Sequence, residues 1–425
     1  MTHKREITTA LKSNLRRAGI HLLIFLKWLL VAAVVGSVVG LVCTLFYHAL
    51  NSATALREQY PFLLYFLPLG GLLIVFFYRV SHTPEPRGTN LVIGAVRTGE
   101  TIPIKMTPLI FVGTVLTHLF GGSAGREGAA LQLGGSLGDF FGRLLRFSPT
   151  ERNLVVMCGM SAGFSALFGT PVAAAVFAME LISVGVMYYA ALVPCAVSSF
   201  IAIFLAGQFG VKPERFSFSV LPASDLPNLG RVLLLAALCA GVSILFCLLL
   251  HRTERGLRRL LKNSYLRVFA GGCTVVLLTL LLGTRDYLGA GLSVIEHAVQ
   301  GNTRPEAFLL KMIFTTLTLA AGYKGGEIVP TFFIGATFGC LAGPFLGLDP
   351  GFSAAIGMVS LFCGVTNCPL TALLLAVELF GLSSPLLFLV AVAVSYMLSG
   401  YYSLYSSQRI LYSKTEAEYV NRETK

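Results

Sequence analysis

Two glutamates occupy the most glycine-rich segments of a chain that is otherwise apolar. Glu127 follows Arg126 in residues 121–135, GGSAGREGAALQLGG, and Glu327 follows Gly326 in a second such segment. Glycine permits turns that other residues resist, and the free N–H groups where a helix begins form a site for an anion. A carboxylate beside such a site would compete with the anion when charged and leave the site to it when protonated. These residues therefore suit the coupled movement of an anion and a proton.

Two more glutamates are interpreted as serving the fold. Glu180 and Glu378 are each followed by leucine and stand nine residues after a proline, which is typical of a paired feature near a helix end. A structural role, ion-paired or interfacial, stays open for Glu127 and Glu327 as well, and Arg126 would then be a neutralising partner. Glycines spaced four residues apart predict close helix packing; they are Gly134, Gly138 and Gly142.

The composition places these residues in a membrane protein. Of 425 residues, 55% are hydrophobic and 12% charged, with a mean hydropathy of +0.77, whereas soluble domains carry about 25% charged residues. A helix crosses a bilayer with about twenty apolar residues. Such runs recur at 19–48, 61–79, 103–120, 153–181, 187–207, 231–250, 269–283, 306–322, 327–348, 352–380 and 385–403. We therefore predict an all-α, polytopic membrane protein. The first run is too long for a signal peptide, so we expect it to remain attached.

Basic residues beside the apolar runs predict the orientation. Residues 1–18 contain five lysines and arginines against one glutamate, and residues 251–267 contain six against one. Loops rich in lysine and arginine stay in the cytoplasm, so we expect a multi-pass protein of the cell membrane with cytoplasmic N- and C-termini. The expected domains are a cytoplasmic segment, a first membrane repeat, an extracytoplasmic connection, a second membrane repeat and a short cytoplasmic tail, at 1–18, 19–207, 208–230, 231–406 and 407–425.

The chain repeats itself at a nearly constant offset. Pro171 and Glu180 recur 198 positions later as Pro369 and Glu378, and Gly-Arg-Glu in the first half aligns with Gly-Gly-Glu in the second. Internal repeats with interrupted helices at matching positions are typical of secondary transporters. Irregular backbone at membrane depth needs protein or water around it, so the two glycine segments should meet in the interior. The residues alone leave open whether the repeats are inverted.

Three motifs in this order resemble the CLC family of chloride channels and transporters, over about residues 25–410. The family motif G-R-E-G-P matches Gly125 to Gly128, with alanine in place of the proline, and G-x-F-x-P matches Gly326 to Pro330 with isoleucine in place of phenylalanine. The pore tyrosine of a late L-Y-S segment matches Tyr405. This resemblance implies the CLC-type fold, in which two inverted repeats bring broken helices to an anion site at the membrane midplane. It also implies a homodimer with one pathway in each subunit and no cofactor.

Departures from the common motifs indicate a branch of the family. Where chloride-selective members have G-S-G-I-P, this chain has GTNLV at 88–92, so that Thr89 or Asn90 stands in the place of the anion-binding serine. Glu327 fills the second position of G-x-F-x-P, and Leu181 stands where proton-coupled chloride exchangers often carry a second glutamate. This combination resembles the fluoride/proton antiporters of the family.

The resemblance implies a secondary active transporter that exchanges fluoride for protons and exports fluoride. Glu127 would be the gating carboxylate that carries the proton, and Glu327 a second proton-linked or anion-binding group. The Asn90 amide offers two N–H donors against one from a serine hydroxyl, which suits an anion as strongly hydrated as fluoride. The candidate anion ligands are Thr89, Asn90, Gly128, Glu327, Ile328 and Tyr405.

Other functions stay open. The same fold would suit a chloride/proton antiporter or a passive chloride channel. The GTNLV segment and Glu327 are the features that favour a fluoride/proton antiporter over these alternatives. The pattern G-x-S-x-G at 121–125, with His118 five residues before Ser123, would suit a serine hydrolase, but that motif needs a strand–turn–helix setting, so we predict no enzyme. The sequence contains no C-x-x-C, H-E-x-x-H or P-loop pattern, and we expect no metal, cofactor or nucleic-acid partner. The expected partners are fluoride or chloride, protons, the lipid bilayer and a second copy of the chain.

Overall fold

The computed structural model describes residues 2–83, 88–381 and 384–424, which form sixteen α-helices. Eight precede the helix-free connection at 209–225: α1 (Thr2–Gln59), α2 (Leu67–Val80), α3 (Thr89–Thr98), α4 (Met106–Leu119), α5 (Glu127–Leu144), α6 (Pro149–Phe168), α7 (Pro171–Glu180) and α8 (Leu192–Gln208). Eight follow it: α9 (Leu226–Leu260), α10 (Ser264–Leu282), α11 (Leu292–Val299), α12 (Ala307–Ala321), α13 (Ile328–Ala342), α14 (Pro350–Thr366), α15 (Pro369–Phe380) and α16 (Pro385–Leu398). Short 3-10 helices lie at Pro61–Phe66, Tyr189–Ala191 and Pro344–Leu346.

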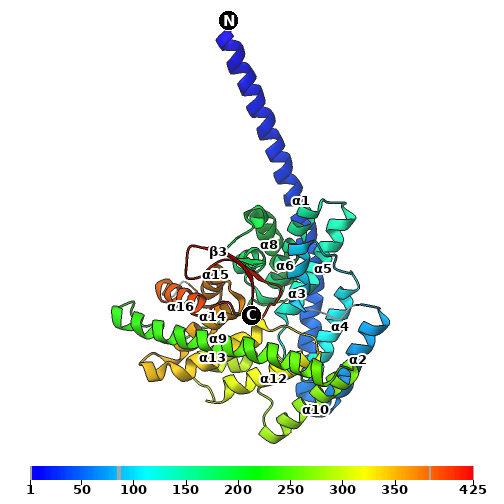
Figure 1. Ribbon diagram of the computed structural model, residues 1–425, viewed down its shortest axis with the longest axis vertical. Coiled ribbons are helices and arrows are strands. Elements are labelled where there is room, and N and C mark those ends of the chain that lie inside the picture. The colour runs from blue at the N-terminus through cyan, green and yellow to red at the C-terminus, as the bar shows by residue number, and fades with distance from the viewer. Residues whose placement is uncertain (1, 84–87, 382–383, 425) are drawn as a thin grey trace.

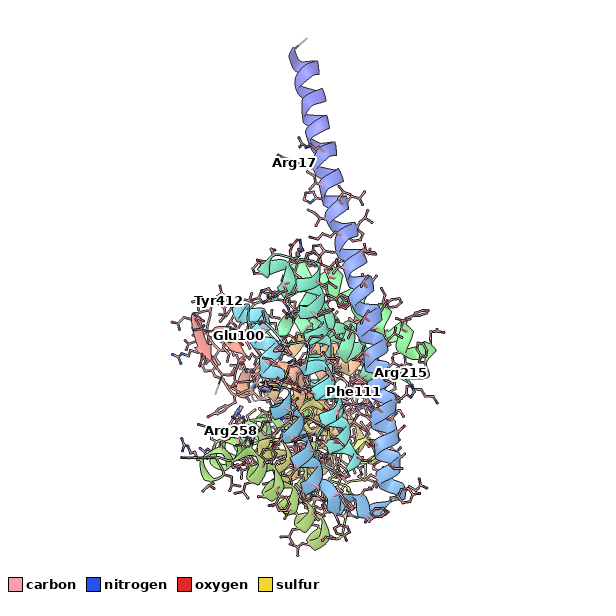
Figure 2. All side chains as sticks on the ribbon, turned by 90° about the vertical axis from the view of Figure 1, so that its right-hand side faces the viewer. Arg17, Glu100, Phe111, Arg215, Arg258 and Tyr412 are labelled. Carbon is pink, nitrogen blue, oxygen red and sulfur yellow. The ribbon has the colours of Figure 1, made fainter. Side chains whose placement is uncertain are left out.

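Long apolar helices and outward-facing apolar side chains suit a bilayer. Within the described residues, five helical segments have the length and composition to cross a membrane, including most of α1 and the whole of α9. Large hydrophobic side chains on these helices are exposed, among them Leu23, Leu30 and Leu245. Figure 1 shows the N-terminal part of α1 leaving the body of the molecule as a single helix, and Figure 2 places Arg17 on this projection.

Two apolar runs that look continuous in the sequence are interrupted at matching places. A turn separates α6 from α7, and another separates α14 from α15. Gly169 (φ 78°) and Asn367 (φ 58°) end the preceding helices in the left-handed conformation. Pro171 and Pro369 then start the next helices, where the N–H group that proline lacks has no helical partner. The predicted repeat is therefore present in the helices as well as in the sequence.

Reciprocal hydrogen bonds join the two halves. The Glu180 carboxylate at the end of α7 accepts hydrogen bonds of 3.0 and 2.9 Å from the first turn of α15. The Glu378 carboxylate near the end of α15 accepts bonds of 3.0 and 2.8 Å from the first turn of α7. The backbone donors are Leu370 and Thr371 in α15, and Val172 and Ala173 in α7. These contacts confirm the interpretation of both glutamates as helix-end residues. They are also reciprocal, because each half supplies a glutamate that accepts hydrogen bonds from a helix of the other half.

Glycines let neighbouring helices approach at their backbones. A Cβ atom on Gly134 of α5 would lie 1.9 Å from the carbonyl oxygen of Gly159 in α6. The matching contact in the second half places a Cβ atom on Gly335 of α13 2.4 Å from the carbonyl oxygen of Gly357 in α14. No larger residue fits at either position without moving a helix, which confirms the predicted close packing at Gly134.

A small sheet adds to the helical fold, and the sequence pattern did not predict it. Strand β2 (Arg409–Tyr412) pairs in parallel with β1 (Ser183–Val184) and antiparallel with β3 (Tyr419–Glu423). Tyr412 and Glu100 lie on the same side of the molecule in Figure 2. The last residues are thereby attached to the end of α7, and they reach the region around α3. The division into domains, and the side of the membrane on which each lies, stay predictions.

Candidate anion-transport site

The two glycine segments meet directly, as expected from the sequence. The Gly125 N–H donates to the Gly326 carbonyl (2.7 Å), and the Gly326 N–H donates to the Gly125 carbonyl (2.8 Å), which forms an antiparallel bridge. A Cβ atom on Gly128 would lie 2.8 Å from the Gly326 Cα atom, so only glycine permits this approach. The bridge brings the N-termini of α5 and α13 together. Their first-turn N–H groups, which include those of Gly128 and Ile328, have no partner within the helix and favour an anion.

Glu127 is fully buried at the start of α5 and is held by its neighbour. One carboxylate oxygen accepts a hydrogen bond from the Arg126 guanidinium Nε, and the other accepts one from the Arg126 backbone N–H, both at 3.1 Å. Arg126 also forms an ion pair with Glu214 from the connection at 209–225 and lies over the ring of Tyr47, 5.2 Å from its centroid. A buried ion pair of this kind needs both partners, since either one left alone would be costly.

Three buried oxygens beside the glycine bridge have no hydrogen-bond partner: Thr89 Oγ1, Glu327 Oε2 and the Tyr405 hydroxyl. A Cβ atom on Gly128 would lie 3.2 Å from Glu327 Oε2 and 3.3 Å from Thr89 Oγ1, so these two oxygens flank one point in front of α5. Tyr405 is 1% exposed. Buried polar groups are rarely left unpaired, and these three atoms are suited to hold a ligand.

Asn90 is oriented by a residue far along the chain. Its Oδ1 atom accepts a hydrogen bond of 2.8 Å from the backbone N–H of Ser407, and the Ser407 carbonyl accepts one of 2.5 Å from Arg97. This bond assigns Oδ1 as the acceptor end of the amide, and Asn90 lines the cavity described below, so its N–H₂ group with two donors belongs to a cavity-lining side chain. Thr89, one residue earlier, is buried and faces the glycine bridge. The structure therefore gives the two residues different positions, which the sequence could not separate.

A cavity of about 430 Å³ connects this region with the surface. Asn90, Gln132 and Glu327 line its inner part, and Gln132 donates a hydrogen bond of 3.0 Å to the Gly128 carbonyl. Basic side chains outnumber acidic ones in the rest of its wall, where Glu254 pairs with Arg258 at 3.0 Å. The basic residues are Arg79, His251, Arg258, Arg267 and Lys324. Arg258 on α9 is visible at the side of the molecule in Figure 2. A wall of this charge raises the local concentration of small anions.

Two contacts near the site were not anticipated. Glu214 belongs to a segment whose charges balance, and nothing in its sequence places it beside Arg126. Gln408 donates to the carbonyl oxygens of Leu181 (3.0 Å) and Thr366 (2.7 Å), which anchors the turn that carries Tyr405. Leu181 therefore contributes its backbone carbonyl, and not its side chain, to holding this turn in place. Such contacts join residues far apart in the sequence and leave no local pattern.

The hydrolase alternative loses its geometric basis. Ser123 Oγ lies 3.0 Å from the hydroxyl of Thr315, and His118 Nδ1 lies 2.9 Å from the carbonyl oxygen of Thr114. A serine nucleophile needs a hydrogen bond to its base, and neither residue is the other's partner here. Among the described residues, no group of three or more histidines, cysteines, aspartates or glutamates is placed to hold a metal ion.

The model of the voltage gated chloride channel family matches residues 69–400. The chain belongs to this family. A protein of Pseudomonas syringae pv. tomato, named as a chloride/fluoride channel protein, is 36% identical over 395 residues, which cover 91% of this chain and 87% of the relative. A protein of Vibrio cholerae, named as an H(+)/Cl(-) exchange transporter, is 28% identical and covers 83% of this chain and 81% of its own length.

Solved structures show the same fold. The crystal structure of a CLC-type fluoride/proton antiporter superimposes with a TM-score of 0.87 at 32% identity, covering 90% of this chain and 98% of that one. A slow cyanobacterial Cl-/H+ antiporter superimposes with a TM-score of 0.76 at 20% identity, over 88% and 94% of the two chains. These matches confirm the predicted family and the polytopic helical fold. The family is one of channels and transporters, and the roles of single residues in this chain stay predictions.

Proposed function

We propose that this protein is a secondary active transporter that exchanges fluoride for protons and exports fluoride from the cell. The observation that carries the proposal is the orientation of Asn90, whose acceptor oxygen is bound by Ser407 and whose two N–H donors belong to a cavity-lining side chain. Fluoride is small and strongly hydrated, so a site must replace its water shell with several close donors. The Asn90 amide, the hydroxyls of Thr89 and Tyr405 and the first-turn N–H groups of α5 and α13 would supply them.

Proton coupling would follow from Glu127. In its charged form the carboxylate lies at the N-terminus of α5 beside Arg126, where it competes with an anion for the same positive field. Protonation removes this competition and weakens the ion pair with Arg126, so the side chain can leave the site to fluoride. Glu327 would act beside it: once protonated, its free oxygen becomes an O–H donor to the ion. Each fluoride would then be accompanied by an oppositely directed proton.

The comparisons support fluoride as the substrate. Both a relative at 36% identity and a solved structure at 32% identity carry fluoride in their names. By analogy with the family, we propose a homodimer in the cell membrane with one pathway in each subunit and both termini in the cytoplasm. The alternative is a chloride/proton antiporter or a passive chloride channel, which the Vibrio cholerae relative represents.

The deciding experiment uses purified protein in liposomes. A fluoride gradient is imposed at a clamped voltage, proton and fluoride movements are recorded together, and the measurement is repeated with chloride. We expect fluoride to drive protons in the opposite direction and chloride to drive few. Fluoride flux without protons would make the protein a channel, and equal proton movement with chloride would favour the chloride antiporter.

A further inference from the structure

A second cavity, of about 420 Å³, adjoins the site from another direction. Its wall includes the C-terminal end of α1, His118 of α4, Arg126 and the loop at 285–293. It reaches Arg126, whose guanidinium holds Glu127, but its lining contains neither Asn90 nor Glu327. The cavity therefore borders the gating carboxylate without being part of the central site.

The charges around this second cavity are mainly positive. Arg57, Arg126 and Arg285 line it, against Glu58 and Asp286. Arg126 is already paired with two glutamates, and Asp286 lies 3.5 Å from an arginine outside the cavity. Within the described part of the chain, Arg57 and Arg285 have no carboxylate within 4.0 Å. Two guanidinium groups thus face the cavity without an anionic partner.

A fully buried lysine lies beside this cavity. Lys311 on α12 is 0% exposed and donates hydrogen bonds to the carbonyl oxygens of Gly289 (2.7 Å) and Tyr287 (3.2 Å). A Cβ atom on Gly291, which lines the cavity, would lie 3.5 Å from the lysine nitrogen. The loop that forms one wall of the cavity therefore lies directly against this buried basic group.

His118 is a buried polar group of the cavity whose ring lacks one hydrogen-bond partner. It is 3% exposed, and its Nε2 atom is buried without a hydrogen bond. Its Nδ1 atom must carry hydrogen, because its partner at 2.9 Å is the carbonyl oxygen of Thr114. Nε2 is therefore the atom that gains or loses a proton. The carbonyl of His118 accepts a hydrogen bond of 2.9 Å from Arg57, which fixes the two side chains of α4 and α1 beside each other.

A proton on His118 would add a positive charge to a basic environment, because Arg57, Arg126 and Lys311 lie near it. The negative groups that face the cavity, Glu58 and Asp286, lie on the end of α1 and on the 285–293 loop. An anion among the guanidinium groups would reverse this balance, because it attracts the proton that the arginines repel. Nε2–H would then donate to the ion.

We propose that this cavity is a second anion-binding site, which holds a halide ion between the Arg57 guanidinium and protonated His118, with Arg285 completing the positive wall. The ion enters with one proton, which is carried on Nε2. The inference concerns halide binding alone and does not rest on fluoride/proton exchange. It extends the description of the protein from one anion site to two, with the Arg126–Glu127 pair between them.

The test measures halide binding to the full-length protein in detergent by titration calorimetry, with sodium fluoride and sodium bromide as probes. Titrations are made at about pH 5.5 and about pH 8, on either side of the usual titration range of histidine. We expect one more halide ion per subunit at the acid pH than at the alkaline pH, both in the wild-type protein and in Glu127→Gln, in which the central site cannot titrate through that carboxyl group. Arg57→Gln should weaken binding of that ion about tenfold, which corresponds to about 1.4 kcal/mol.

Two further variants complete the experiment. His118→Gln cannot titrate, so binding of the additional ion should become the same at both pH values. Arg259→Gln is the matched control, since Arg259 is exposed on α9 and lines neither cavity. If Arg57→Gln fails to fold by thermal melting, His118→Gln carries the test through its pH dependence. Wild-type binding in both variants would overturn the proposal, as would displacement of the halide by inorganic phosphate at a lower concentration.

Discussion

The two glycine–glutamate segments have a similar arrangement of the backbone, but their glutamate side chains have different hydrogen-bond partners. They bridge each other through Gly125 and Gly326, and each starts a helix at its glutamate or immediately after it. In the first segment Arg126 holds both oxygens of Glu127, whereas glycine stands at the matching position before Glu327, which keeps one buried oxygen free. The residue before the glutamate thus contributes to the contrast in two ways, because the Arg126 side chain and its backbone N–H both bind Glu127, whereas Gly326 has no side chain and its N–H donates to Gly125.

The other pair of glutamates shows the opposite outcome. Glu180 and Glu378 have kept equivalent positions, and each caps the helix that starts in the other half. Where the repeat serves the fold, both copies make the same contacts. Where it forms the proposed anion site, the copies differ. The comparison predicts that changes at the first pair will act on transport, and changes at the second pair on stability.

The largest effect is expected for Glu127→Gln. The amide resembles the protonated carboxyl in shape but can neither release a proton nor pair with Arg126 as a charge. Proton movement driven by fluoride should fall about 100-fold or more, in line with the loss of an essential acid–base group. Proton flux into liposomes is the measurement, and Glu416→Gln, on an exposed position near the C-terminus, is the control. Full coupled exchange in Glu127→Gln would remove this residue from its proposed role.

Glu180→Gln and Glu378→Gln should act on stability and should act alike. Each change replaces charge-assisted hydrogen bonds to backbone N–H groups and points an amide N–H₂ group toward another donor. We expect a loss of about 2 kcal/mol in the free energy of unfolding for each, within the range for bonds to charged groups. Denaturant unfolding in detergent measures this. A large difference between the two variants would contradict their equivalence, and unchanged stability would contradict the capping role.

Glu327→Gln should reduce fluoride transport about tenfold, equivalent to about 1.4 kcal/mol. The amide retains a donor for the ion but cannot exchange a proton with it, so the effect should be smaller than at Glu127. The informative readout is the ratio of protons to fluoride in liposomes. Transport at the wild-type rate with unchanged coupling would assign Glu327 to the structure alone and remove the contrast between the two segments.

The smallest effect is expected for Asn90→Ser, which exchanges an amide with two donors for a hydroxyl with one. The loss of one net hydrogen bond, about 1 kcal/mol, should lower the preference for fluoride over chloride about fivefold. Paired flux measurements with the two anions give this ratio, and Asn302→Ser, at an exposed position, serves as the control. An unchanged ratio would mean that Asn90 does not select the anion.

Much of the helical fold could be predicted from the sequence, because helices and repeats produce local patterns of residues. Apolar runs give most of the helices, and the shared offset of Pro171 and Glu180 from Pro369 and Glu378 gives the repeat, but the breaks at these prolines lie inside runs that look continuous in the sequence. The hydrogen-bond partners of these residues could not be predicted. A carboxylate that caps a helix of the other half produces no sequence pattern in its own segment. The same holds for Glu214, and for Ser407 beside Asn90. The hydrogen bond from Ser407 also shows that Asn90 and Thr89 have different surroundings. The motif alone does not show which of the two takes the place of the serine.

The contact between Ser407 and Asn90 also has a consequence for biosynthesis. Asn90 leaves the ribosome 317 residues ahead of the backbone N–H that orients it, so nearly the whole membrane domain is synthesised before this amide is fixed. The turn that carries Tyr405 arrives equally late. A chain interrupted during synthesis would therefore hold both glycine segments and both glutamates but not a finished anion site.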